Sequence, residues 1–305
     1  MGSKIILMEN KTSRRNAMKK IVEGAATVAL TGAISSRLNA ADNEMGVALK
    51  RRINHSVCRW CYDSIELEAL CKAAKTIGLQ SIELLTVEEF STVKKHDLTC
   101  AMVSGIGKDY GITKGWNTKE NHDGLEEWYK YLIDETSKAG FTNLICFSGN
   151  RAKKIDDEDG LKNCAKGLKK ILNYAEKKKV TIVMELLNSK IDHKDYMCDH
   201  TDWGVELCKK IDSDNFKLLY DIYHMQIMEG DIINTIRANS KYIAHYHTGG
   251  VPGRHEIDET QEIYYPSIMN AIVETGYRGF VAQEFIPARA DKLASLKQGV
   301  NICDI

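Results

Sequence analysis

The chain has 305 residues, 43% of them hydrophobic and 28% charged, which is enough for one large globular domain or two modest ones. Its 42 basic and 42 acidic residues balance, so the composition argues against a general nucleic-acid binder or a polybasic membrane surface and favours a small-molecule partner. With three prolines and no low-complexity tract or visible linker after about residue 50, the sequence favours one domain.

The first forty residues differ from the remainder. A basic segment at 13–20 is followed by a mostly apolar run of small residues at 24–34. This order is typical of an export leader, and the pair Arg14-Arg15 resembles a twin-arginine signal. The apolar run is too short to span a bilayer. We therefore expect residues 1–41 to be a leader that directs the protein to the periplasm, with no membrane segment in the mature form. The alternative is a disordered or helical arm on a cytoplasmic protein.

From Arg52 onward, short apolar runs alternate with segments of helical periodicity. The strand-like runs lie at 53–58, 81–86, 98–105, 143–150, 181–188, 216–224, 243–250 and 279–285. The main helical patterns lie near 64–78, 124–139, 203–211, 232–239 and 264–275, with a short helix after the second run and a Lys-rich helix ending near 179. Eight strands that are apolar on both faces, each followed by a helix, are what a closed parallel barrel requires. We expect residues 52–305 to form a single-domain α/β fold, the (β/α)8 TIM barrel. An open doubly wound sheet is less favoured, because no Gly-rich phosphate fingerprint follows the first run.

Each of the last four runs carries one potential metal ligand near its end. The four are Glu185 in V-M-E-L-L-N, Asp221 in L-L-Y-D-I-Y-H, His247 in I-A-H-Y-H-T-G-G and Glu284 in F-V-A-Q-E-F. A buried carboxylate needs a cation or a hydrogen-bond network, and the carboxyl ends of barrel strands share one mouth. One such residue alone is readily a buried hydrogen-bonded group, but four at matched depth indicate a metal site. Three carboxylates and one imidazole suit Mn²⁺, Mg²⁺ or Co²⁺, and Zn²⁺ less well.

These segments resemble the sugar isomerase and epimerase barrels of the xylose-isomerase-like superfamily, and within it the hydroxypyruvate isomerase group. The most specific segment is H-Y-H-T-G-G-V-P-G-R-H-E, supported by M-E-L-L-N and L-Y-D-I-Y-H-M-Q. The resemblance implies the same four metal ligands as the spacing does. The chain departs from many hydroxypyruvate isomerases at His247, where they have Gln and ketose epimerases have His.

The resemblance also implies residues that bind the substrate. His224 and Arg254 match positions that hold substrate oxygens in related epimerases, and Asn188 ends the M-E-L-L-N motif. The planar donor fork of Arg254 fits a carboxylate or hydroxyls. Trp60 follows the first run and would form an apolar wall over the substrate. The plainer alternatives are a turn cap for His224, a surface ion pair with Glu256 for Arg254, and a packed core side chain for Trp60.

Such a family catalyses the movement of a carbonyl between adjacent carbons or the inversion of the carbon beside it. Both reactions remove a proton next to a carbonyl and return one through an enediolate. Glu185 and Glu284 would face the substrate from two sides, one as base and the other as acid, and a divalent metal would stabilise the developing charge. We expect a metal-dependent isomerase or epimerase of a small sugar or keto acid.

Three other functions compete with this hypothesis. Cys58 and Cys61 form a C-x-x-C, but they directly follow a barrel strand, whereas a redox motif opens a helix in a smaller fold. The nine cysteines are scattered, and we expect buried free thiols. Related DNA-repair endonucleases need more histidines and a basic groove. A non-catalytic sugar-binding barrel is the third alternative.

Overall fold

Seven parallel strands form one sheet in the computed structural model, which describes residues 49–305. Their order across the sheet is β2-β1-β7-β6-β5-β4-β3. The strands are β1 (Asn54–Cys58), β2 (Ser81–Glu83), β3 (Asn143–Cys146), β4 (Thr181–Glu185), β5 (Phe216–Asp221), β6 (Ile243–Thr248) and β7 (Phe280–Gln283). The expected export leader, residues 1–41, lies outside the described residues.

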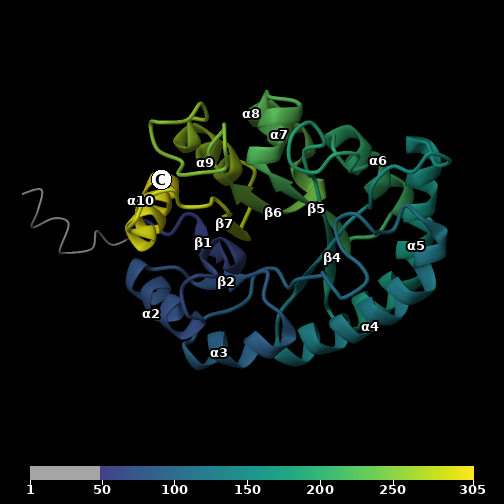
Figure 1. Ribbon diagram of the computed structural model, residues 1–305, viewed down its shortest axis with the longest axis horizontal. Coiled ribbons are helices and arrows are strands. Elements are labelled where there is room, and N and C mark those ends of the chain that lie inside the picture. The colour runs from purple at the N-terminus through teal and green to yellow at the C-terminus, as the bar shows by residue number, and fades with distance from the viewer. Residues whose placement is uncertain (1–48) are drawn as a thin grey trace, which may run out of the picture. The chain divides into compact units, whose positions relative to one another are not determined.

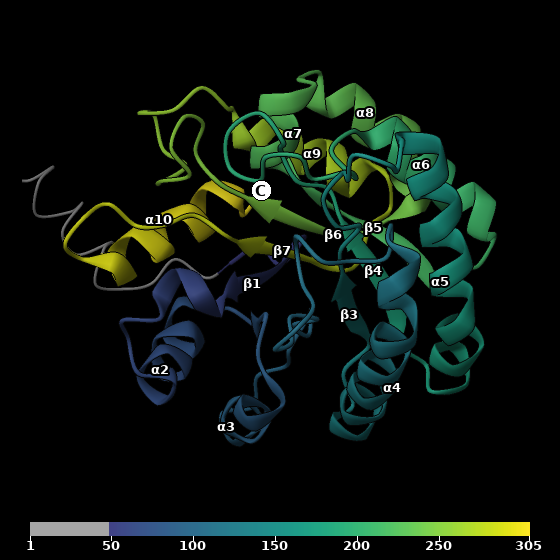
Figure 2. The ribbon, with the colours of Figure 1, turned by 45° about the vertical axis from the view of Figure 1, so that its right-hand side comes forward.

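Helices surround this sheet, as Figure 1 shows. They are α2 (Leu67–Ile77), α3 (Phe90–Lys95), α4 (His122–Ala139), α5 (Asp157–Lys177), α6 (Thr201–Ile211), α7 (Ile222–Met228), α8 (Ile232–Asn239), α9 (Tyr265–Glu274) and α10 (Lys292–Cys303). Helix α4 contacts β3, α5 contacts β4 and α6 contacts β5, so these three helices cover the outer side of neighbouring strands (Figure 2). The alternation predicted from the sequence is therefore confirmed over most of the chain.

The prediction of eight strands was wrong at the third run, 98–105. In the described residues this run makes only isolated bridges, from Thr99 to Ser81 in β2, and from Val103 to Leu85 just after β2 and to Leu144 in β3. Between these points the Met102 carbonyl accepts the Leu84 N–H, and side chains bond the backbone of Ala101. The Ala101 N–H donates to Ser81 Oγ, and its carbonyl accepts from Asn143 Nδ2. The run nevertheless lies between the two edge strands, β2 and β3, and is bonded to both. It therefore closes the seven-stranded sheet into a barrel.

Two helices were not expected from the sequence. Helix α7 begins inside the run predicted as a strand over 216–224, because the Asp221 carboxylate accepts the His224 N–H and caps a new helix. Helix α10 follows the last strand. The end of α2 agrees with expectation, since Gly78 has a φ of 102°, a left-handed conformation that suits glycine at a helix terminus.

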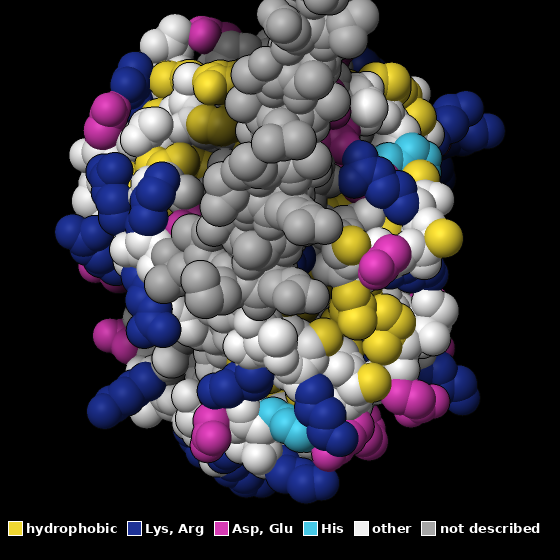
Figure 3. Space-filling view, turned by 90° about the vertical axis from the view of Figure 1, so that its left-hand side faces the viewer, with side chains coloured by type: hydrophobic (Ala, Val, Ile, Leu, Met, Phe, Trp, Pro, Cys, Tyr) yellow, Lys and Arg dark blue, Asp and Glu magenta, His cyan; other side chains and the backbone are white. Residues whose placement is uncertain are grey.

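The strand side chains fill the barrel interior, and most of the core is apolar. All nine cysteines are buried and unpaired, as predicted. No helix among residues 49–305 is long and apolar enough to cross a membrane. On the face drawn in Figure 3, Lys and Arg side chains lie interspersed with Asp and Glu side chains.

Candidate active site

The four residues predicted as metal ligands come from four neighbouring strands. Glu185 ends β4, Asp221 ends β5, His247 lies in β6 and Glu284 directly follows β7. Asp221 and His247 are paired in register across β5 and β6. All four are buried, and one ligand atom from each lies within 4.8 Å of all the others. The structure thus brings this set together at the carboxyl ends of the strands.

Two cationic side chains contact the three carboxylates. His247 Nδ1 lies 2.8 Å from Glu284 Oε2 and 3.4 Å from Glu185 Oε1. Arg254 Nη2 lies 2.6 Å from the same Glu284 oxygen and 3.3 Å from Asp221 Oδ2. Arg254 is only 12% exposed, which excludes the alternative of a surface ion pair with Glu256.

The two glutamates of the site are driven towards different protonation states in the absence of a cation. Burial raises the pKa of Glu185, against the opposing effect of the nearby His247. Burial also opposes ionisation of Glu284, but the charges of His247 and Arg254 outweigh it and hold the pKa of Glu284 well below its usual value. Two carboxyl groups with divergent pKa values are suited to opposite roles in proton transfer.

His224 presents a ring N–H beside Asp221. The Asn188 Nδ2 group donates to His224 Nδ1 over 2.7 Å, while Asn188 Oδ1 accepts the backbone N–H groups of Ile191 and Asp192. The proton of the neutral His224 ring therefore resides on Nε2. That nitrogen is buried without a hydrogen-bond partner, 3.5 Å from Asp221 Oδ2. Burial lowers the pKa of His224 well below its usual value, so the ring is neutral.

A cavity of about 270 Å³ opens beside these groups. Glu185, Glu284 and Arg254 line one part of it, and Trp60 forms part of its wall. The remaining wall is mainly apolar and includes Leu84, Ile106, Ile112, Ile145, Phe147 and Leu187. Larger hollows, of about 420 and 600 Å³, lie elsewhere on the surface and contain none of the predicted site residues.

Trp60 lies at this cavity as predicted, and it also contacts the charged groups. Its Nε1 donates to Glu284 Oε1 over 2.8 Å, and its ring centroid lies 5.1 Å from the Arg254 guanidinium. It is 40% exposed, so it is not a packed core side chain. Asn188 and His224 are fully buried and are not among the residues that line the cavity. Asn188 instead contacts the opposite side of the His224 ring.

One buried residue of this region, Glu83, was not among the predicted site residues. It ends β2, and its Oε1 lies 2.9 Å from His247 Nε2 and 2.7 Å from His245 Nε2. Burial opposes its ionisation, but the two imidazoles lower the pKa of Glu83 to about 2. A lone acid late in the apolar run S-I-E-L-L-T is the same signal that Glu185 carries, and it was present in the sequence.

The two thiols of the C-x-x-C motif do not form a redox centre by the usual criteria. Cys58 and Cys61 are buried, and burial raises the pKa of each thiol well above its usual value. A reactive cysteine needs a stabilised thiolate and access to solvent. These two thiols have neither, so the oxidoreductase hypothesis is not supported.

The fold and the site together define a parallel α/β barrel with a carboxylate and imidazole centre at the carboxyl ends of its strands. The chain belongs to the xylose isomerase-like TIM barrel family, whose model matches residues 71–302. The superfamily resemblance drawn from the sequence motifs is thereby confirmed.

Curated relatives match parts of the chain. It is 35% identical to the 2-oxo-tetronate isomerase of Cupriavidus necator over 124 residues, which are 41% of this chain and 46% of that protein. It is 27% identical to the hydroxypyruvate isomerase of Escherichia coli over 55% of this chain and 63% of that protein. The matched segments therefore span about half the length of these relatives.

Solved structures share the fold over most of the chain. An AP endonuclease, family 2, from Brucella melitensis aligns with a TM-score of 0.71 and 19% identity, covering 80% of this chain and 96% of that one. The D-psicose 3-epimerase with D-tagatose from Clostridium cellulolyticum H10 aligns with a TM-score of 0.67 and 18% identity, covering 83% of this chain and 100% of that one. At these identities the likeness shows the fold alone.

Proposed function

We propose that the protein is a divalent-metal-dependent isomerase or epimerase of a small sugar or keto acid, similar to hydroxypyruvate isomerases. The observation that carries the proposal is the convergence of three carboxylates and one imidazole within 4.8 Å at one edge of a cavity. The names of the matched relatives, 2-oxo-tetronate isomerase and hydroxypyruvate isomerase, support the same class of reaction.

The donor set fits a hard or borderline divalent cation. Glu185, Asp221, His247 and Glu284 are buried, and Oε1 of Glu185 has no hydrogen-bond partner. An orphaned carboxylate oxygen inside a cluster of like charges is costly unless a cation compensates it. Oxygen ligands with one imidazole favour Mn²⁺, Mg²⁺ or Co²⁺ over Zn²⁺.

Proton transfer would be carried out by the two glutamates that line the cavity. One carboxylate removes the proton next to the substrate carbonyl, and the other carboxyl group returns a proton to the enediolate. The bound cation would supply Lewis-acid stabilisation of the charge that develops on the substrate oxygens. The divergent pKa values of Glu185 and Glu284 favour an unequal division of the two roles, which the cation would modify.

Three other side chains would position the substrate. The Nε2–H of His224 has no hydrogen-bond partner, but it lies outside the lining of the cavity. It would donate to a substrate oxygen only where the substrate reaches the side of Asp221. The Nε of Arg254 donates to the Glu284 carbonyl, and its Nη2 donates to the carboxylates of Glu284 and Asp221. Within residues 49–305 no hydrogen bond involves its Nη1, and this nitrogen is suited to a substrate carboxylate or hydroxyl. Trp60 would cover one face of the substrate, and Asn188 would act on it only through His224.

The first experiment measures the metal content of protein purified without chelator or affinity nickel, beside the Glu185→Gln variant. We expect about one Mn, Mg, Co or Zn per chain, lost in the variant. Glu256→Gln is a matched control, since Glu256 is a buried carboxylate that bonds Ser295 and backbone N–H groups instead. Equal metal content in all three proteins would refute the site.

The second experiment tests catalysis. Hydroxypyruvate, tartronate semialdehyde and 2-oxo-tetronate, followed by ketoses, are incubated in deuterated solvent, and exchange of the α-proton is followed by NMR. Glu284→Gln should abolish exchange while ligand binding persists. Binding without exchange by the unchanged, metal-loaded protein would favour the non-catalytic sugar-binding barrel.

Export remains a separate proposal. The basic and apolar order of residues 1–41 supports a twin-arginine-type leader and a periplasmic location. Secretion of a fusion of these residues to a reporter, compared with an Arg14→Lys, Arg15→Lys double variant, tests it. Equal secretion of both fusions would refute a twin-arginine signal.

A further inference from the structure

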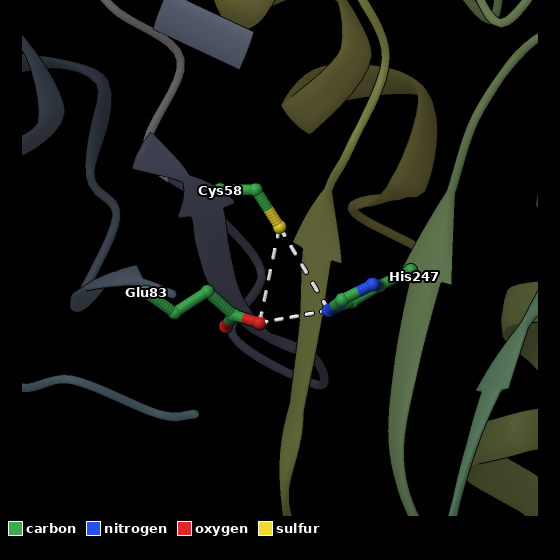
Figure 4. A group of neighbouring side chains, drawn as sticks. All are labelled: Cys58, Glu83 and His247. Atoms are coloured by element: carbon green, nitrogen blue, oxygen red, sulfur yellow. Dashed lines mark hydrogen bonds and ion pairs between the residues drawn. The ribbon is translucent and has the colours of Figure 1, made fainter. Parts of the chain in front are cut away.

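The imidazole of His247 lies between two groups of side chains. Its Nδ1 faces Glu284 and Glu185 in the proposed cation site. Its Nε2 faces Glu83 and Cys58, as Figure 4 shows. Glu83 lies on β2 and His247 on β6, and two strands separate them in the sheet, so this contact crosses the barrel interior.

We propose that Glu83 is a positioning residue, which holds the His247 ring with its proton on Nε2 and so reserves the Nδ1 lone pair for the cation. This inference rests on the proposed metal site. Glu83 does not line the cavity. Of the four proposed ligands it contacts only His247.

The hydrogen-bond geometry supports this assignment. An ionised carboxylate only accepts, so the 2.9 Å contact between Glu83 Oε1 and His247 Nε2 requires the proton on that nitrogen. Without a cation, the 2.8 Å contact of Nδ1 with Glu284 Oε2 places a second proton on the ring. A cation at Nδ1 would displace that proton, while Glu83 keeps the proton on Nε2. Nδ1 is the atom that faces the carboxylates of the cation site. A carboxylate on the far nitrogen of a ligating histidine also increases the basicity of the ligand.

His245 strengthens this arrangement by fixing Glu83 itself. It lies two residues before His247, so both rings project from the same face of β6. Its Nε2 lies 2.7 Å from the same oxygen, Glu83 Oε1. The second oxygen, Oε2, is buried without a hydrogen-bond partner. Oε1 is therefore the Glu83 oxygen that both imidazoles contact. The Cys58 thiol makes a third, weak contact with the same oxygen at 3.9 Å.

The same atoms suggest one competing arrangement, a second cation held by Cys58, Glu83 and His247. It is less favoured, because His247 Nε2 and Glu83 Oε1 are already bonded to each other and all three residues are fully buried. A cation there would have to displace the Nε2 proton as well as the thiol proton.

The test compares Mn²⁺ dissociation constants, measured by electron paramagnetic resonance of the free ion. Glu83→Gln keeps the side-chain shape but removes the charge and offers a donor as readily as an acceptor. We expect it to weaken Mn²⁺ binding by about 10- to 100-fold. The matched variant Cys58→Ala removes only a weak contact and should change binding by less than about threefold. Circular dichroism checks that each variant is folded.

A measurement on the unchanged protein keeps the inference testable if Glu83→Gln does not fold. Nitrogen-15 histidine NMR of the Zn²⁺-loaded protein should show His247 bound through Nδ1 and protonated on Nε2. An unprotonated Nε2, unchanged affinity in folded Glu83→Gln, or a second cation lost in Cys58→Ala would each overturn the role of Glu83. If the unchanged protein binds no divalent cation, the proposed function fails instead.

Discussion

Removal of the Arg254 guanidinium tests how the three carboxylates are stabilised together. Arg254 Nη2 contacts both Glu284 and Asp221, and the group is 12% exposed. Truncating one partner of a buried ion pair costs about 3–5 kcal/mol. A domain of this size loses about 2–4 °C in Tm per kcal/mol. We therefore expect Arg254→Met to lower the Tm of the metal-free protein by about 10 °C.

The loss should be partly reversed by the cation. The proposed cation would compete with Arg254 for the carboxylates of Glu284 and Asp221, so Mn²⁺ would compensate their charge when the guanidinium is gone. At one fixed Mn²⁺ concentration, the variant without the competing guanidinium should bind the ion more tightly, and each tenfold lower dissociation constant adds about 1.4 kcal/mol of stability. The Mn²⁺-induced rise in Tm should therefore be larger in Arg254→Met than in the unchanged protein.

The assay is thermal unfolding followed by circular dichroism, with chelator or with excess Mn²⁺. Arg151→Met is the control, because Arg151 is 31% exposed and pairs with Asp157 and Asp199 away from the site. It should cost less and show no larger response to Mn²⁺. An Arg254→Met protein with unchanged Tm in chelator, or with a smaller Mn²⁺ response than the unchanged protein, would refute this reasoning.

Three further predictions concern stability and the thiols. Gly78→Ala should lower the free energy of unfolding by about 1–2 kcal/mol, because an alanine is strained at a left-handed φ. The loss should exceed that of the control Gly140→Ala, because the new Cβ at residue 78 would lie 2.8 Å from Leu49 Cδ1 and the one at residue 140 meets nothing within 4 Å. Equal losses in urea unfolding would show that the Leu49 contact plays no role. Burial opposes ionisation of Asp199, but hydrogen bonds from Arg151 and other groups lower its pKa. The stability that this carboxylate contributes is present above its unfolded pKa of about 4 and is lost as pH falls through the lower folded pKa. The Tm difference between the unchanged protein and Asp199→Asn should therefore shrink on acidification. A Tm difference that stays constant with pH would contradict the lowered pKa of Asp199. A thiol reagent should react slowly with the native protein and with all nine cysteines after denaturation, whereas rapid labelling of the native protein would show that the buried thiols are accessible.

The site could be predicted largely from the sequence because its signal is local. Glu185, Asp221, His247 and Glu284 each stand near the end of an apolar run. In a parallel barrel, the carboxyl ends of all strands meet at one face, so residues at the same depth must converge. Arg254 was identified by motif resemblance and Trp60 by its place after the first run, and the structure places both at the cavity.

Contacts across the barrel were decided only by the tertiary structure. The run at 98–105 has strand-like composition, but only isolated bridges join it to its neighbours, and the side chains of Ser81 and Asn143 bond its backbone at Ala101. Glu83 and His247 are 164 residues apart, and they meet because the sheet curls on itself. Periodicity in the sequence reports which face of an element is buried, whereas the partner that a buried polar atom finds depends on curvature, register and side-chain reach. The sequence by itself determined most of the elements and the four side chains that converge, and the curled sheet determined which partners hold each of them.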